Sequence, residues 1–96
     1  MGSKFLENDL KDVIKKERFY EFPEFLRQIR TALGPSRRKV SSDLDIPYEK
    51  LNRLEHGEFK TFYLFEINAL AEYYGIQRSL LTKKCKKFLK ETKCES

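Results

Sequence analysis

The sequence predicts an all-α protein, a compact bundle of five to six short helices in a single domain. Apolar residues recur at helical spacing in successive windows, and no window shows the strict alternation that is typical of a half-buried strand. Proline and glycine residues separate these windows where helices commonly begin and end. With 96 residues, the chain can form one hydrophobic core but not two independent cores.

The first element expected is an extra N-terminal helix over residues 5–19, within an extension that spans residues 1–22. Four apolar residues, Leu6, Leu10, Val13 and Ile14, form one stripe on this helix. Asn8 or Asp9 is the candidate N-cap. The stripe fits either a contact with a second subunit, which we favour, or a cap on the protein's own core.

Three helices are expected next, and two of them are unusually short. Pro23 begins a helix that Gly34 ends, and its apolar residues Phe25, Leu26, Ile29 and Leu33 keep helical spacing. Ser36 caps a helix of two turns that stops before Asp45, and Pro47 begins another that stops at Gly57. Such short helices need packing on neighbours to be stable, and their close succession indicates helix-turn-helix geometry.

Two further helices complete the predicted fold. Thr61 is a candidate cap for a helix over residues 62–74 that Gly75 ends, and a last helix begins near Arg78. We separate residues 83–96 as a basic helix end and tail. Its apolar side could form a dimer or lie near DNA, although a solvated lysine face is the commoner case. This side comprises Leu81, Cys85, Phe88 and Leu89, among five lysines between 83 and 90.

Composition excludes several classes of protein. The net charge is +5, and the excess lies in residues 23–57 (seven basic against five acidic) and 82–96 (six against two). We find no apolar run long enough to span a membrane and no signal peptide, so we expect a cytoplasmic protein without a membrane partner. Two cysteines near the tail and a single histidine predict reduced thiols and no metal or cofactor. No catalytic motif is present, so we expect no enzyme.

The helix expected at residues 47–56 has a narrow apolar side and a chemically diverse polar side. Pro47, Leu51 and Leu54 fall together, while the other side spans about 140° of the helix. Asparagine, arginine, glutamate and tyrosine are residue types that contact base edges in the major groove, although many solvated helices also carry mixed polar residues. The residues on this side are Tyr48, Glu49, Asn52, Arg53 and His56.

The preceding short helix begins with three cations, Arg37, Arg38 and Lys39. The positive end of the helix dipole disfavours cations in a first turn. A DNA phosphate bound by these side chains and by the turn at Ser36 would remove the conflict. The alternative is that they are tolerated surface charges.

Glu55 lies at the border of the apolar side, on the turn nearest the helix that carries Arg30. We predict that these two residues form a partly buried ion pair that fastens the 47–56 helix to the rest of the domain. Removal of one partner from such a pair would cost several kcal/mol.

Residues 25–57, together with INALAEYYGI at residues 67–76, resemble the phage repressor and Cro family, also called the XRE family. The resemblance covers roughly residues 24–82 and implies a lambda-repressor-like helix-turn-helix domain over residues 23–82. The sequence departs from the family pattern where Arg37 replaces a glutamine; Ser41 keeps a small residue and Asp45 a turn residue, but the family usually has alanine and glycine there. The matching residues are Arg30, Ser36, Val40, Ser41, Leu44, Asp45, Ile46, Leu51, Arg53, Leu54, Glu55 and Gly57.

The resemblance implies a sequence-specific regulator of transcription, usually a repressor or autoregulator, that binds double-stranded DNA as a homodimer. Half-sites in a palindromic operator would lie about 34 Å apart. The alternative is an antitoxin-type module that neutralises a partner toxin and regulates its own operon. Base-reading residues would be Tyr48, Glu49, Asn52 and Arg53; phosphate-binding residues would be Ser36, Arg37, Arg38, Lys39, Lys50, His56 and Lys60.

Aromatic residues crowd the loop that follows Gly57. Phe59, Phe62 and Phe65 lie where the family usually has basic residues and a proline. We expect these rings in the core or in an interface rather than in stacking contacts with bases.

Overall fold

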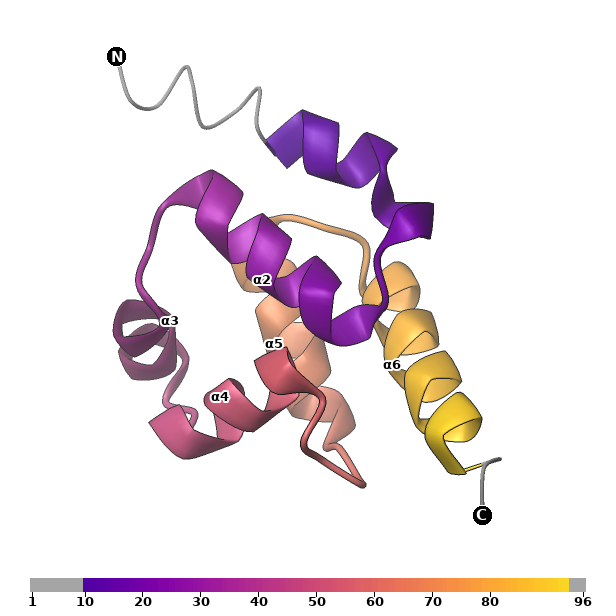
Figure 1. Ribbon diagram of the computed structural model, residues 1–96. Coiled ribbons are helices and arrows are strands. Elements are labelled where there is room, and N and C mark those ends of the chain that lie inside the picture. Colours follow the sequence, from indigo (N-terminus) through magenta and orange to yellow (C-terminus); the bar gives the residue numbers. More distant parts are fainter. Residues whose placement is uncertain (1–9, 94–96) are drawn as a thin grey trace.

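The computed structural model describes residues 10–93 and confirms the all-α prediction. Residues 10–15 are helical, and no strand occurs between residues 10 and 93. Figure 1 shows α3 and α4 together on one side of the bundle and α6 on the other. The elements are η1 (Glu17–Phe19), α2 (Phe22–Leu33), α3 (Arg37–Leu44), α4 (Tyr48–His56), α5 (Leu64–Tyr74) and α6 (Arg78–Lys93).

The N-terminal helix is shorter at its C-terminal end than the sequence predicts. Its regular part ends at residue 15, a turn follows at Lys16, and the short η1 takes the place of the last predicted turn. Val13 is buried, and Leu10 and Ile14 pack half-buried against the core. The described part of the stripe therefore covers the protein's own core, in contrast to the subunit contact that we favoured. Leu6 and the predicted caps Asn8 and Asp9 lie outside the described residues.

Helix α2 is the central element of the bundle and packs on α4, α5 and α6. It begins at Phe22, with Pro23 in its first turn, and Gly34 ends it in the left-handed conformation, as the sequence predicts. Apolar residues at helical spacing give it one fully buried side, and this side organises the core. These residues are Phe22, Phe25, Leu26 and Ile29.

The predicted pair of short helices is confirmed in α3 and α4. The Ser36 hydroxyl accepts a hydrogen bond from the Lys39 backbone N–H at 3.1 Å, which is the predicted N-cap. Asp45 ends α3 with a φ of 57°, a left-handed conformation that aspartate tolerates better than most residues. Ile46 is then buried, which fixes the direction in which α4 leaves the turn.

Gly57 ends α4 at a point where only glycine fits. Its φ is 72°, and a Cβ atom there would lie 2.9 Å from the Phe88 ring of α6 and 3.3 Å from Pro23 of α2. The end of α4 is thus packed directly on two other helices. The absence of a side chain at residue 57 permits this close contact.

The predicted cap at Thr61 is wrong. Helix α5 begins at Leu64, and its N-cap is Tyr63, which makes no side-chain capping bond. The aromatic residues before the helix pack instead, since Phe59 lies between Phe22 and Phe88 at ring-centroid distances of 5.6 and 5.7 Å. Helix α5 therefore begins without a polar cap, after a segment that packs on the core.

Helix α6 is continuous from Arg78 to Lys93, so the predicted boundary between residues 82 and 83 falls inside it. Leu81 and Cys85 are fully buried, and Phe88 packs half-buried against the same core. Leu81, Cys85 and Phe88 therefore belong to the core of the domain, while Leu89, the fourth residue of the predicted apolar side, is half-buried. No helix between residues 10 and 93 is long and apolar enough to cross a membrane.

The burial of Cys85 makes its reactivity a test of the packing of α6. Desolvation raises the pKa of the Cys85 thiol to about 12. Because the thiolate is the reactive form, a pKa about three units above its usual value lowers the thiolate population about a thousandfold at neutral pH.

We therefore predict that, in a Cys94→Ser background, Cys85 reacts with an aromatic disulfide reagent at least a thousandfold more slowly in the native protein than in denaturant. Absorbance of the released thiol would measure both rates. Equal rates would contradict the packing of α6 on the core.

Candidate nucleic-acid interface

The polar side of α4 faces solvent. Leu51, Leu54 and Glu55 are its buried residues. The side chains of Glu49 and Arg53 are 80% and 61% exposed, and Tyr48 and His56 are also exposed. Asn52 is half-buried, and Pro47, which we expected on the apolar side, is exposed.

The exposed side chains of α4 pair weakly with one another. Arg53 contacts the Glu49 carboxylate at 3.4 Å, one helical turn away. Such an exposed pair contributes a few tenths of a kcal/mol, so both groups can exchange this contact for a ligand at little cost. His56 donates a hydrogen bond from Nδ1 to the Asn52 carbonyl at 2.8 Å, which leaves Nε2 directed away from the helix backbone.

Glu55 confirms the predicted ion pair and extends it. The carboxylate is fully buried rather than partly buried, and Arg30 binds both of its oxygens, with Nε at 2.8 Å and Nη2 at 3.1 Å. Arg37 adds a third bond from Nε to Oε1 at 3.0 Å. Arg27 donates to the backbone carbonyl of Glu55. Three arginines from α2 and α3 thus surround one residue of α4.

Arg37, which we predicted to bind a phosphate, instead binds Glu55. Its Nε is occupied by Glu55, and Nη1 donates to the Tyr48 hydroxyl at 3.3 Å. Burial acts to lower the pKa of Arg37, but the bonds to Tyr48 and Glu55 outweigh it and raise that pKa above its usual value. Arg37 is therefore a structural partner of Glu55, and only its outer edge is left for a ligand.

The other two cations of the first turn of α3 also have partners within the chain. Arg38 lies over the Tyr48 ring at 5.0 Å, and Lys39 pairs with Asp43 at 3.1 Å. The Tyr73 hydroxyl donates to the same Asp43 at 2.6 Å, and this bond and Lys39 lower the pKa of Asp43. The electrostatic conflict at the start of α3 is thus partly relieved inside the protein. Arg38 and Lys39 nevertheless remain exposed.

A shallow basic depression lies beside α4, between the start of α3 and the end of α2. It encloses about 250 Å³, and three guanidinium groups and two hydroxyl groups surround it. This combination of donors suits an oxyanion such as a phosphate group. The depression is lined by Arg30, Ser36, Arg37, Arg38 and Tyr48.

Lys50 and Lys60 lie on the opposite flank of α4, and the structure separates their roles. Lys50 pairs with the buried Glu66 at 3.1 Å and lies 3.8 Å from the centre of the Tyr63 ring. Lys50 therefore attaches α4 to the start of α5. Lys60 is exposed in that loop, beside an open groove of about 800 Å³ between α4 and residues 57–61.

Several of these contacts were not predicted from the sequence. Arg27 lies three residues before Arg30 on α2, so helical spacing alone could have placed it beside the same residue, where it binds the Glu55 backbone carbonyl. No comparable signal links Lys50 to Glu66 or Arg37 to Glu55, because those pairs are brought together by the crossing of helices.

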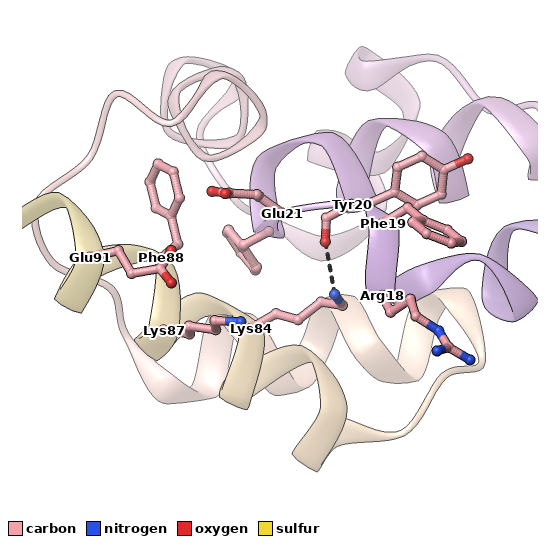
Figure 2. Close-up of a pocket in the computed structure, with 9 residues that line it drawn as sticks. Arg18, Phe19, Tyr20, Glu21, Lys84, Lys87, Phe88 and Glu91 are labelled. Atoms are coloured by element: carbon pink, nitrogen blue, oxygen red, sulfur yellow. Dashed lines mark hydrogen bonds between the residues drawn. The ribbon is translucent and has the colours of Figure 1, made fainter.

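Figure 2 shows a second, smaller depression of about 190 Å³, between η1 and α6. Lys84 donates to the backbone carbonyls of Glu17 at 2.7 Å and Tyr20 at 2.8 Å, and it pairs with the Glu17 carboxylate at 3.0 Å. Its ammonium group is therefore fully engaged in attaching the N-terminal segment to α6. We assign this depression a structural role.

Comparisons of the chain with protein-family models, with curated proteins and with solved structures find no match. Among residues 10–93, no group of three His, Cys, Asp or Glu side chains could hold a metal ion.

The Glu55 cluster predicts a large effect on stability. Glu55→Gln keeps the shape of the side chain but removes the charge that Arg30 and Arg37 bind, and we expect it to lower the free energy of unfolding by about 3 kcal/mol. Denaturation by urea would measure the change.

Glu49→Gln is the matched control, because Glu49 lies on the same helix with its side chain 80% exposed. We expect it to change the free energy of unfolding by less than about 0.5 kcal/mol. Equal effects of the two substitutions would refute the structural role of the cluster.

Proposed function

We propose that the protein is a sequence-specific regulator of transcription, of the repressor or autoregulator type, which inserts α4 into the major groove of double-stranded DNA in the cytoplasm. One geometric feature carries most weight. The buried Glu55 holds α4 at its C-terminal end, while the polar side of the helix faces solvent, with Asn52 half-buried and its other residues exposed. A helix fixed in this way presents its outward side chains at defined positions, as base recognition requires.

The four outward residues have the chemistry to contact base edges. Arg53 can bind guanine in two places, Asn52 can bind adenine in two places, and Glu49 can accept from the cytosine amino group. Tyr48 lies at the start of the helix, where its ring can contact a thymine methyl group. The weak pair between Arg53 and Glu49 at 3.4 Å keeps both side chains over the face without burying them.

The cations on either side of α4 support phosphate contacts in the same orientation. Arg38 and Lys39 lie on one flank with the Ser36 turn, and Lys60 lies in the loop on the other. Arg37, Lys50 and His56 have partners within the chain, so we assign them a secondary share of the phosphate contacts.

A second candidate function has one observation in its favour. Tyr63, Leu64 and Phe65 are more than half exposed at the start of α5, and exposed apolar groups in succession are typical of protein-binding surfaces. An antitoxin-type protein that binds a toxin through this surface would fit it. Such a protein would also regulate its own operon through α4.

A selection of bound sequences from random duplexes tests the proposal. We expect an enriched palindrome whose half-sites are centred about one helical turn apart, because two copies of α4 would enter successive major grooves. Sequencing of the bound fraction would measure the enrichment. Retention of all duplexes alike, with no enriched motif, would refute sequence-specific recognition.

Two arginine substitutions should separate base contacts from phosphate contacts. We expect Arg53→Ala to lose about 1–3 kcal/mol of discrimination at one base pair. Arg38→Ala should weaken binding to all sequences equally and reduce the slope of log affinity against log salt by about one. Fluorescence anisotropy across a salt series would measure both, and a loss of discrimination in Arg38→Ala would contradict its assignment to phosphate.

A further inference from the structure

The segment from Thr61 to Thr82 carries almost no charge in an otherwise highly charged chain. Charged residues make up 36% of the protein, but only Glu66, Glu72 and Arg78 occur among these 22 residues. Even these three have partners: Glu66 binds Lys50 at 3.1 Å, and Arg78 lies 3.8 Å from Glu72. The surface formed by the start of α5 and the start of α6 is thus close to neutral.

Burial in the core explains only part of this pattern. Ile67, Leu70 and Tyr74 are buried and need to be apolar. Tyr63, Leu64 and Phe65, in contrast, are 57%, 53% and 70% exposed. The rings of Tyr63 and Phe65 stack on each other at 5.8 Å, so they form one ordered apolar patch. Depletion of charge around exposed aromatic residues is the composition typical of the centre of a protein interface.

A groove lies directly beside this patch. It encloses about 530 Å³ between α5 and the start of α6, and four of the six residues that line it have uncharged polar side chains. Leu64 belongs to both the patch and the groove, so a protruding apolar group and a recess adjoin on one surface. Such a surface can complement itself across a two-fold axis, as the interface of a symmetric dimer must. The groove is lined by Leu64, Asn68, Gln77, Arg78, Ser79 and Thr82.

The position of the patch relative to α4 suits a dimer on DNA. Lys50 of α4 lies 3.8 Å from the centre of the Tyr63 ring, so the patch adjoins the flank of the proposed recognition helix. A two-fold axis through the patch would bring the two copies of α4 to either side of that axis, as a palindrome requires. The terminal helices are less suited, because the apolar residues Val13, Leu81 and Cys85 are buried in the core.

We propose that a second copy of this chain covers the patch formed by Tyr63, Leu64 and Phe65, with each Phe65 packing against the partner's α5 and its groove. The α5 patch, rather than either terminal helix, is the dimer interface. The spacing of the two α4 helices on an operator follows from this interface and rests on the proposed DNA-binding function. The dimer itself does not rest on it.

Phe65→Glu tests the interface, and Phe19→Glu is its matched control. Phe65 is 70% exposed, and Phe19 is 75% exposed on η1, which lies beside α6 and away from α4 (Figure 1). A glutamate in the first turn of α5 is favoured by the helix dipole, so the fold of the subunit should survive. Circular dichroism would verify the fold of both variants.

Sedimentation velocity over a series of concentrations would measure the oligomeric state without DNA. We expect the wild type and Phe19→Glu to form dimers of twice the 11.5 kDa chain mass, and Phe65→Glu to remain monomeric. A monomeric wild type, or a Phe65→Glu variant that still forms dimers, would overturn the proposal.

Binding to duplexes with one or two half-sites separates this proposal from the function. We expect Phe65→Glu to bind a single half-site as the wild type does but to lose about a hundredfold in affinity for the palindrome, because the second contact is no longer linked to the first. Absence of specific DNA binding, together with a dimer that Phe65→Glu disrupts, would refute the function and support the interface. Specific binding with unchanged affinity of Phe65→Glu for the palindrome would refute the interface and leave the function standing.

Discussion

The buried carboxylate of Glu55 is the interaction on which the arrangement of the short helices depends. A helix of nine residues has little stability alone. Helix α4 also gains little from apolar packing, since Leu51 and Leu54 are its only buried apolar residues. Arg30 from α2 and Arg37 from α3 compensate the charge of Glu55, and Arg27 binds its backbone carbonyl. Three helices are thus joined at one fully desolvated point. The orientation of α4, and with it the direction of its polar side, follows from that point.

The same cluster changes how the positive charge of the chain is to be understood. A net charge of +5 suggests a basic protein with many free cations, but much of this charge is used within the described residues. Arg30 and Arg37 neutralise Glu55, Lys50 neutralises the buried Glu66, and Lys84 attaches the N-terminal segment through backbone carbonyls. The cations that remain exposed around α3 and α4 are fewer: Arg38 and Lys39 lie on one flank, Arg53 lies on the outward side of α4, and Lys60 lies in the loop on the other flank.

Local sequence signals predicted the helices well and the contacts between them less well. Ser36 as a cap, Asp45 in a left-handed turn and Gly57 as a terminator act within a few residues of the chain, so their effects can be recognised without a fold. Thr61 failed as a cap: α5 begins at Leu64, and Phe59 in the segment before it packs between Phe22 and Phe88. The N-terminal stripe was recognised correctly, but its partner was not. Periodicity shows that Val13 needs an apolar neighbour and does not show whether the neighbour is the same chain or another.

By itself, the sequence determined the helical architecture, the short α3–α4 pair, the residues on the outward side of α4 and the pairing of Arg30 with Glu55. These features follow from helical periodicity, capping and the need of a charge near an apolar side for a partner. Only the tertiary structure decided that Glu55 is fully buried, that Arg37 is drawn to it, and that Leu81 and Cys85 of the last helix lie in the core of the same subunit. It also left Tyr63, Leu64 and Phe65 exposed beside α4. The physical reason is that burial, and which arginines bind one carboxylate, depend on how the helices cross. Arg37 and Glu55 are 18 positions apart in the chain, so no local pattern links them.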